Sequence, residues 1–159
     1  MKKLFIILAS TTFFACDSKD DNNVSSFYLN TSIDFSVFNA DGEDLLDPET
    51  PNHLEESKIK LFYVVNGVTK EFFEGHLDHP RNIMIYKSEK EYIIGVGLNH
   101  YENGKSTTYI QWNEKDTDTI EATFVRGKNF IYPKDVWLNG KLVSEGTKRA
   151  ESPYVRLTK

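Results

Sequence analysis

An alternation of apolar and polar residues with a period of two runs through most of this chain and restricts it to β structure. Ile33, Phe35 and Val37 form one face of such a run, with polar residues between them. Alternation of this kind predicts half-buried strands. No window of a dozen residues gives a helical stripe. The same pattern recurs in 58–65, 92–98, 110–112, 120–124 and 155–157.

The turn signals agree with this pattern. Asn66-Gly67 lies between 58–65 and 68–73, and Asn139-Gly140 lies between 136–138 and 141–143. Asn-Gly between two alternating runs is a strong hairpin signal. Asn103-Gly104 is expected to join 93–100 to 106–113, and Ser88-Glu89-Lys90 to turn the chain between 83–86 and 92–98. Eight to ten short strands result.

Short strands joined in this way predict an all-β, antiparallel two-sheet β-sandwich, either immunoglobulin-like or prealbumin-like. A small β-barrel is the alternative. The 11 Phe, 8 Tyr and 2 Trp residues supply the large apolar areas that such a core needs. We find no internal repeat and no sign of a second domain.

The first residues have the order of a secretory signal peptide. A basic start, Met1-Lys2-Lys3, precedes an uncharged apolar stretch over 4–14, which ends at Ala15-Cys16. The apolar stretch is too short to span a bilayer core, which needs about 20 residues. We expect a signal peptide over 1–15, a lipidated N-terminal tether over 16–26 and a single β domain over 27–159.

The junction Phe13-Phe14-Ala15-Cys16 resembles the lipobox of bacterial lipoproteins, with aromatic residues at its first two positions. The resemblance implies cleavage after Ala15 and acylation of Cys16 with three chains, palmitate among them. The acidic segment 18–21 resembles the export signal of surface lipoproteins of the Bacteroidetes group. It implies a lipid-anchored, surface-exposed protein of the outer membrane. In other Gram-negative groups, Asp17 instead implies inner-membrane retention.

Segments 42–51, 109–118 and 137–140 are similar to small surface lipoproteins of the same bacterial group. This resemblance implies no activity and transfers no functional residue.

The net charge and the single cysteine limit the kinds of partner and cross-link that this chain can have. The formal net charge is −5, and the predicted signal peptide carries two lysines and no acid, so the remainder has −7. This balance argues against nucleic acid as a partner. With Cys16 acylated, no thiol remains for a disulfide. The expected partners are the lipid bilayer, through acylated Cys16, and a protein or glycan ligand.

The most acidic segment is 39–49, with five carboxylates within nine residues. Calcium prefers such oxygen ligands. However, Val37 and Pro48 occupy the first and last ligand positions of an EF-hand loop. We therefore predict no metal between Asp41 and Asp47, and a pair of turns with Leu45 and Leu46 beneath a sheet.

The remaining motifs predict no catalytic residue and no cofactor. His76 and His79 flank Asp78, but a structural zinc site needs four ligands, so we expect a surface loop. Gly95-Val96-Gly97 precedes no helix and is no dinucleotide loop. It is better explained as a strand that a neighbour approaches closely.

Four aromatic residues are a candidate ligand platform: Trp112, Trp137, Tyr109 and Tyr132. Aromatic side chains in strands also build cores, which is the alternative for each of them. The sequence favours a non-enzymatic envelope lipoprotein with a binding or accessory role. An envelope glycan or peptide hydrolase and a structural component of an envelope assembly are the alternatives.

Overall fold

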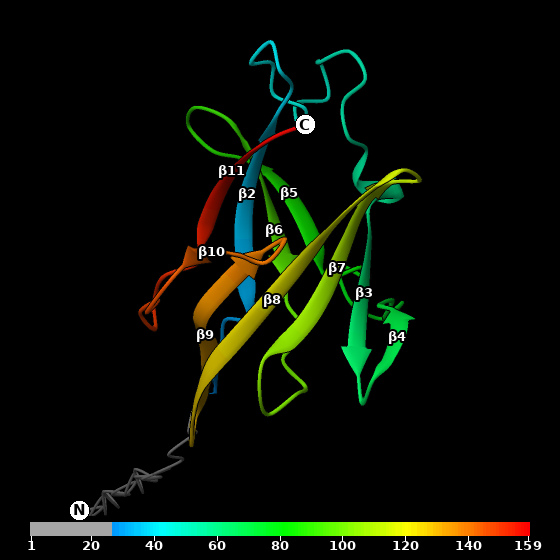
Figure 1. Cartoon of the computed structure of the whole chain (residues 1–159). Helices are drawn as coiled ribbons and strands as arrows, with labels where there is room; N and C mark the ends of the chain where they lie inside the picture. Colours follow the sequence, from blue (N-terminus) through cyan, green and yellow to red (C-terminus); the bar gives the residue numbers. More distant parts are fainter. Residues whose placement is uncertain (1–26) are drawn as a thin grey trace, which may run out of the picture.

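The computed structural model describes residues 27–159 (Figure 1). Eleven strands form two sheets that face each other across one core, with one turn of 3₁₀-helix, η1 (Glu56–Lys58). Within 27–159 there is no α-helix, and thus no helix that could span a membrane. The predicted signal peptide, the Ala15-Cys16 junction and the tether lie outside the described residues.

The larger sheet has seven strands in the order β1-β9-β8-β7-β3-β4, with β10 also paired to β9. Its strands are β1 (Tyr28–Leu29), β3 (Lys60–Val65), β4 (Val68–Glu71), β7 (Ser106–Asn113), β8 (Asp116–Gly127), β9 (Phe130–Leu138) and β10 (Lys141–Ser144). The sheet is strongly curled, with a bulge in the long β8–β9 pair. Bulges bend a strand and increase its local twist.

The smaller sheet has the order β11-β2-β6-β5. Its strands are β2 (Ser32–Phe38), β5 (Ile83–Lys87), β6 (Tyr92–Gly97) and β11 (Tyr154–Thr158). The predicted all-β fold with two sheets is confirmed. The expectation that every pair is antiparallel is wrong, because β1 pairs with β9 and β11 with β2 in parallel. These two strands come from opposite ends of the described chain, and their pairing is not set by a hairpin.

The predicted hairpin turns lie at the expected positions. Asn66 and Asn139 have φ values of 52° and 50°, and Gly67 and Gly140 follow with 76° and 78°. Positive φ at both central residues is the geometry of a type I′ turn, which matches the twist of the flanking strands. The Asn-Gly dipeptides thus set the register of β3–β4 and β9–β10.

The core lies between the two sheets and is filled by residues from the alternating runs. Its buried apolar side chains include Ile33, Phe35, Val37, Leu61, Ile94, Val96, Ile110, Trp112, Ile120 and Val136. The rings of Phe35 and Trp112 meet edge to face across the sheets, with centroids 6.0 Å apart. Such aromatic contacts add to the area that each ring buries.

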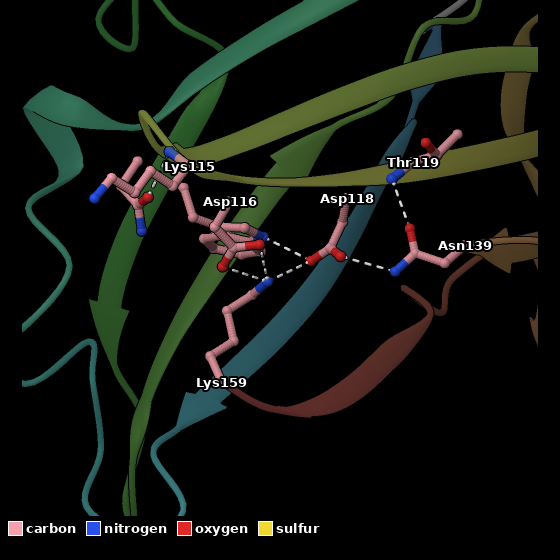
Figure 2. A network of polar contacts seen from close by, with 8 residues as sticks. Lys115, Asp116, Asp118, Thr119, Asn139 and Lys159 are labelled. Carbon is pink, nitrogen blue, oxygen red and sulfur yellow. Dashed lines mark hydrogen bonds and ion pairs between the residues drawn. The ribbon is translucent and has the colours of Figure 1, made fainter.

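A polar network completes one end of this core (Figure 2). The indole Nε1 of Trp112 donates to Asp118 Oδ2 at 2.7 Å, and Asn139 Nδ2 donates to Asp118 Oδ1 at 2.7 Å. Lys159 Nζ binds Asp118 at 2.7 Å and Asp116 at 2.8 Å. Lys159 follows β11, so the network joins the smaller sheet to β7 and β8 of the larger one.

The network fixes the charge of Asp118. Burial alone raises the pKa of this carboxyl, but the hydrogen bonds from Asn139, Lys159 and Trp112 outweigh burial and lower it below its usual range. A lowered folded-state pKa stabilises the fold fully above the unfolded pKa of about 3.9. That contribution is lost as the pH falls through the folded-state value.

We predict that Asp118→Asn lowers the free energy of unfolding at neutral pH by about 1–3 kcal/mol, as expected for a buried charged hydrogen-bond partner. Urea unfolding at neutral pH and over a descending series of acid pH values measures it, and the deficit should shrink as the pH falls through the lowered folded-state pKa, where the wild-type carboxylate becomes protonated. Asp116→Asn is the matched control and should cost less, since it leaves the Trp112–Asp118 bond intact. A deficit that does not change with pH would contradict this account.

Candidate functional site

A hollow of about 370 Å³ opens on the outer face of the smaller sheet. We call it the trough. This volume lies within the range of about 300–1,000 Å³ that is typical of ligand pockets. It is lined by Ser32, Asp34, His79, Asn82, Ile83, Met84, Tyr86, Gly95, Gly97 and Ser152.

Two glycines of β6 create the trough by leaving out side chains from the middle of the sheet. A Cβ atom at Gly95 would lie 3.3 Å from Asp34 Oδ1, and one at Gly97 would overlap the Asn82 amide. The prediction that a neighbour approaches this strand closely is therefore confirmed. Side chains from β2 and from just before β5 lie over the glycine backbone, which forms the floor.

Asp34 is the most unusual group in the trough. Its side chain is half-buried, and no hydrogen bond or ion pair to its carboxylate occurs within residues 27–159. Burial raises the pKa of Asp34. A Cβ atom at Gly95 would lie 3.3 Å from Asp34 Oδ1 and 4.0 Å from Tyr86 Cε1, so both side chains lie over this glycine. Burial raises the pKa of Tyr86, and the Asp34 charge raises it further. No fully buried side-chain oxygen or nitrogen within 27–159 lacks a partner, so the Asp34 oxygens still contact solvent and are open to a ligand.

Asn82 is held in place by a chain of hydrogen bonds through the core. Its Nδ2 donates to Tyr63 Oη at 2.8 Å, and Tyr63 Oη donates to the Gly97 carbonyl at 2.8 Å. Burial of the Tyr63 ring raises the pKa of its hydroxyl, so the hydroxyl remains protonated and able to donate. Asn82 has φ of 55°, a conformation that asparagine tolerates better than most residues.

A second tyrosine stands beside the trough on the edge strand. Tyr154 is the register partner of Asp34, and register partners share a sheet face. Its hydroxyl bonds Ser36 Oγ at 2.6 Å and Glu91 Oε1 at 2.8 Å, so the ring is fixed. On the outer face of the smaller sheet, the Asp34 carboxylate therefore lies between the rings of Tyr86 and Tyr154. No lysine or arginine is among the residues that line the trough.

A larger hollow of about 680 Å³ lies between η1 and the β7–β8 turn. Three lysines line it, but Lys58 pairs with Glu55 at 2.7 Å and Lys60 with Glu71 at 3.7 Å. These side chains are exposed, and each of these two pairs is of the surface kind. The trough, with its half-buried unpaired carboxylate, is the stronger candidate.

Two carboxylates of the acidic segment 39–49 accept hydrogen bonds from backbone N–H groups, in the segment and on β6. Asp44 accepts from the backbone N–H groups of Leu46 and Tyr92, and Asp47 accepts from Glu49. Within 27–159, no three His, Cys, Asp or Glu side chains are grouped as a metal site would need. Leu46 is buried, and Leu45 packs against the core.

The two loop histidines separate in the structure. His76 Nδ1 lies 3.6 Å from Glu74 on the exposed loop between β4 and β5. His79 lies at the rim of the trough. The motif therefore contributes one residue to the candidate site.

The structure does not bring the four platform aromatics together. Trp112 is 1% exposed and belongs to the core, which corrects its place in a surface platform. Tyr109 and Trp137 are half-buried on the opposite face of the larger sheet, where Lys105 Nζ lies 4.2 Å from the Trp137 ring centroid. Tyr132 stacks on Phe130 near the start of β9, with centroids 5.8 Å apart.

The sequence analysis missed Asp34, Met84, Tyr86 and Ser152. Asp34 and Tyr86 are ordinary outward-facing positions of alternating strands, and nothing in their own segments marks them. The available signal was the pair of glycines in β6, read together with the pairing of β6 to β2 and β5. Comparison with protein-family models, curated proteins and solved structures finds no match for this chain.

Trp112 is buried and Trp137 is half-buried, so substituting each by alanine tests their assignment to core and surface. Trp112→Ala should cost about 3–5 kcal/mol of unfolding free energy, because it opens a cavity in the core. Trp137→Ala is the matched control and should cost less than half as much, since the ring is half-exposed. Denaturant unfolding followed by circular dichroism measures both. A Trp112→Ala cost below about 0.5 kcal/mol, the level of ordinary surface substitutions, would return Trp112 to the surface.

Proposed function

We propose that this chain is a lipid-anchored protein of the bacterial cell envelope whose β domain binds a neutral saccharide in the trough. The anchor is the acylated Cys16 that the sequence predicts, at the outer membrane and exposed on the surface. The function is binding, without catalysis.

The single observation that carries the binding function is the unpaired carboxylate of Asp34 above the Gly95 and Gly97 floor. By contrast, the carboxylate of Asp118 accepts hydrogen bonds from three side chains. Asp34 accepts none within 27–159, and its partial burial raises its pKa. A ligand that donates hydrogen bonds would provide this carboxylate with partners.

The composition of the trough favours a saccharide over other ligands. Asp34 offers acceptors, and the Tyr86 hydroxyl offers both a donor and an acceptor. Met84 and the Tyr86 ring supply apolar surface for the C–H face of a sugar. No cationic side chain lines the trough, so an anionic ligand would face Asp34 without compensation.

Among the alternatives, an acid-pair hydrolase requires two carboxylates that flank the scissile bond. The residues that line the trough include one carboxylate, Asp34. This supports binding over hydrolysis. A purely structural role gives no reason for a carboxylate that opposes folding.

The type of β fold is also part of what we propose. We favour a β-sandwich of immunoglobulin-like or prealbumin-like type over a small barrel. Its support is that the strands separate into two sheets with a shared core between them.

The binding claim predicts that filling the trough abolishes binding. Gly95→Val places a side chain on the floor where φ is not restrictive, and should weaken binding to neutral oligosaccharides on a glycan array by at least about tenfold, a loss of roughly 1.4 kcal/mol. Asp34→Asn should also weaken binding, yet should not lower the unfolding free energy, because the ionised carboxylate opposes folding. Gly104→Ala, with nothing within 4 Å, is the control. Retention of binding by Gly95→Val would refute the site.

The anchor predicts a separate outcome. Cys16→Ser should abolish metabolic labelling with a palmitate analogue and move the protein from the membrane to the soluble fraction. Ser18→Ala, in the adjacent tether, should leave both unchanged. Continued acylation of Cys16→Ser would show that the anchor is assigned wrongly.

A further inference from the structure

We propose that one end of the domain, where the described chain begins, docks on an anionic phospholipid surface. The acidic segment 39–49, called here the acidic loop, points away from that surface. We call the docking end the basal end; it comprises 27–31, 66–68, 98–105 and 126–130. The inference rests on the anchor of the proposed function but concerns a different surface from the trough.

The basal segments lie at the same end of the domain and are linked by hydrogen bonds (Figure 1). The Tyr28 amide donates to the Asn129 carbonyl at 2.8 Å, and the Asn66 amide donates to Glu102 Oε1 at 2.7 Å. The Arg126 guanidinium donates to the carbonyls of His100 and Glu102. Asn99 fixes the 98–105 loop further by donating to the Val64 carbonyl at 2.6 Å. The basal end is therefore held in shape before any contact with lipid.

Large apolar side chains gather at this end. Phe27, Leu29, Val68 and Tyr101 are 55%, 54%, 51% and 59% exposed. Single exposed apolar residues are normal on a protein surface. Four on one end, with aromatic rings among them, fit the membrane–water interface, where amphipathic rings sit at headgroup level.

Lys128 at the basal end and Arg149 beside it can face anionic headgroups. Arg126, in contrast, is held by the carbonyls of His100 and Glu102, and Lys105 pairs with Glu121. Arg126, Lys128 and Arg149 form no ion pair with a carboxylate in the part of the chain that the structure describes. The Arg149 guanidinium lies over the rings of Tyr28 and Phe130, 5.2 Å and 4.6 Å from their centroids. Basic side chains beside apolar ones are the combination that binds anionic membranes.

The opposite end has the opposite charge. The five carboxylates of the acidic loop follow β2, while Ser32 at the start of β2 lies beside the basal end. Seven strand residues separate the two ends by about 20 Å. An anionic surface therefore attracts one end and repels the other, which orients the domain.

The predicted tether keeps the basal end within reach of the bilayer. Ten residues, 17–26, separate the acylated Cys16 from Phe27, and the eleven steps from Cys16 to Phe27 span at most roughly 38 Å when fully extended. Residue 27 thus remains within that distance of its own anchor. The trough borders the basal end at Ser32 and Gly97, whereas its Asp34 and Tyr86 lie farther along β2 and β5.

The test is depth-sensitive quenching on the full acylated chain. Because Cys16 is modified, a cysteine introduced at Asn103→Cys in the basal loop, or at Glu49→Cys in the acidic loop, is the single free thiol for a fluorophore. The vesicles contain phosphatidylethanolamine and phosphatidylglycerol with a headgroup spin label. We expect quenching several-fold stronger at position 103 than at position 49.

A pair of double variants identifies the contacts. Phe27→Ser with Lys128→Glu should remove most of the difference in quenching, whereas Leu142→Ser with Lys141→Glu, the same chemistry on β10, should not. Each variant is first shown to retain the wild-type circular dichroism spectrum. Equal quenching at both positions on a membrane-bound chain overturns the docking and leaves the anchor intact. A chain that is not acylated and stays soluble overturns both.

Discussion

The burial of Trp112 between the two sheets sets a requirement that much of the fold meets. A buried indole N–H needs an acceptor, and here that acceptor is the carboxylate of Asp118. A buried carboxylate in turn needs donors, and Asn139 and Lys159 supply them. Lys159 follows β11 of the smaller sheet and Asp118 belongs to β8 of the larger one. The hydrogen bonds that surround Asp118 therefore join the two sheets. No disulfide links the two sheets within residues 27–159, so this hydrogen-bond network supplies one of the links between them.

Asp34 shows the same chemistry with the opposite outcome. Asp118 has three donors and a lowered pKa, whereas Asp34 has no donor within 27–159 and a raised pKa. The chain gives the buried Asp118 three donors and leaves the half-buried carboxylate of Asp34 open to solvent. Residues that oppose folding are commonly retained for function. The glycine floor beneath Asp34 gives the open carboxylate room for a ligand, which is why we place the binding site there.

The strands and tight turns were predictable from local pattern, because alternation and Asn-Gly turns are properties of adjacent residues. Trp112 shares a face with Ile110, and of the two alternatives for this residue, platform or core, the structure confirms the core. The site was not predictable in this way. Tyr86 and Gly95 lie on consecutive strands, but Asp34 lies on β2, far earlier in the chain, and only the pairing of β2 with β6 brings it to them. The parallel pairing of β11 with β2 is equally nonlocal, and no turn between them encodes it.

The central claim, that the trough binds a neutral saccharide, is tested most directly by mapping the contact on the unmodified domain. Titration of ¹⁵N-labelled protein with a neutral oligosaccharide, followed by amide chemical shifts, locates the ligand without any substitution. The account predicts that the largest shifts occur at Gly95, Gly97 and Asp34, with smaller ones at Asn82 and Tyr86. Shifts centred on Tyr109 and Trp137 of the opposite sheet face, or no shifts with any neutral oligosaccharide, would contradict it.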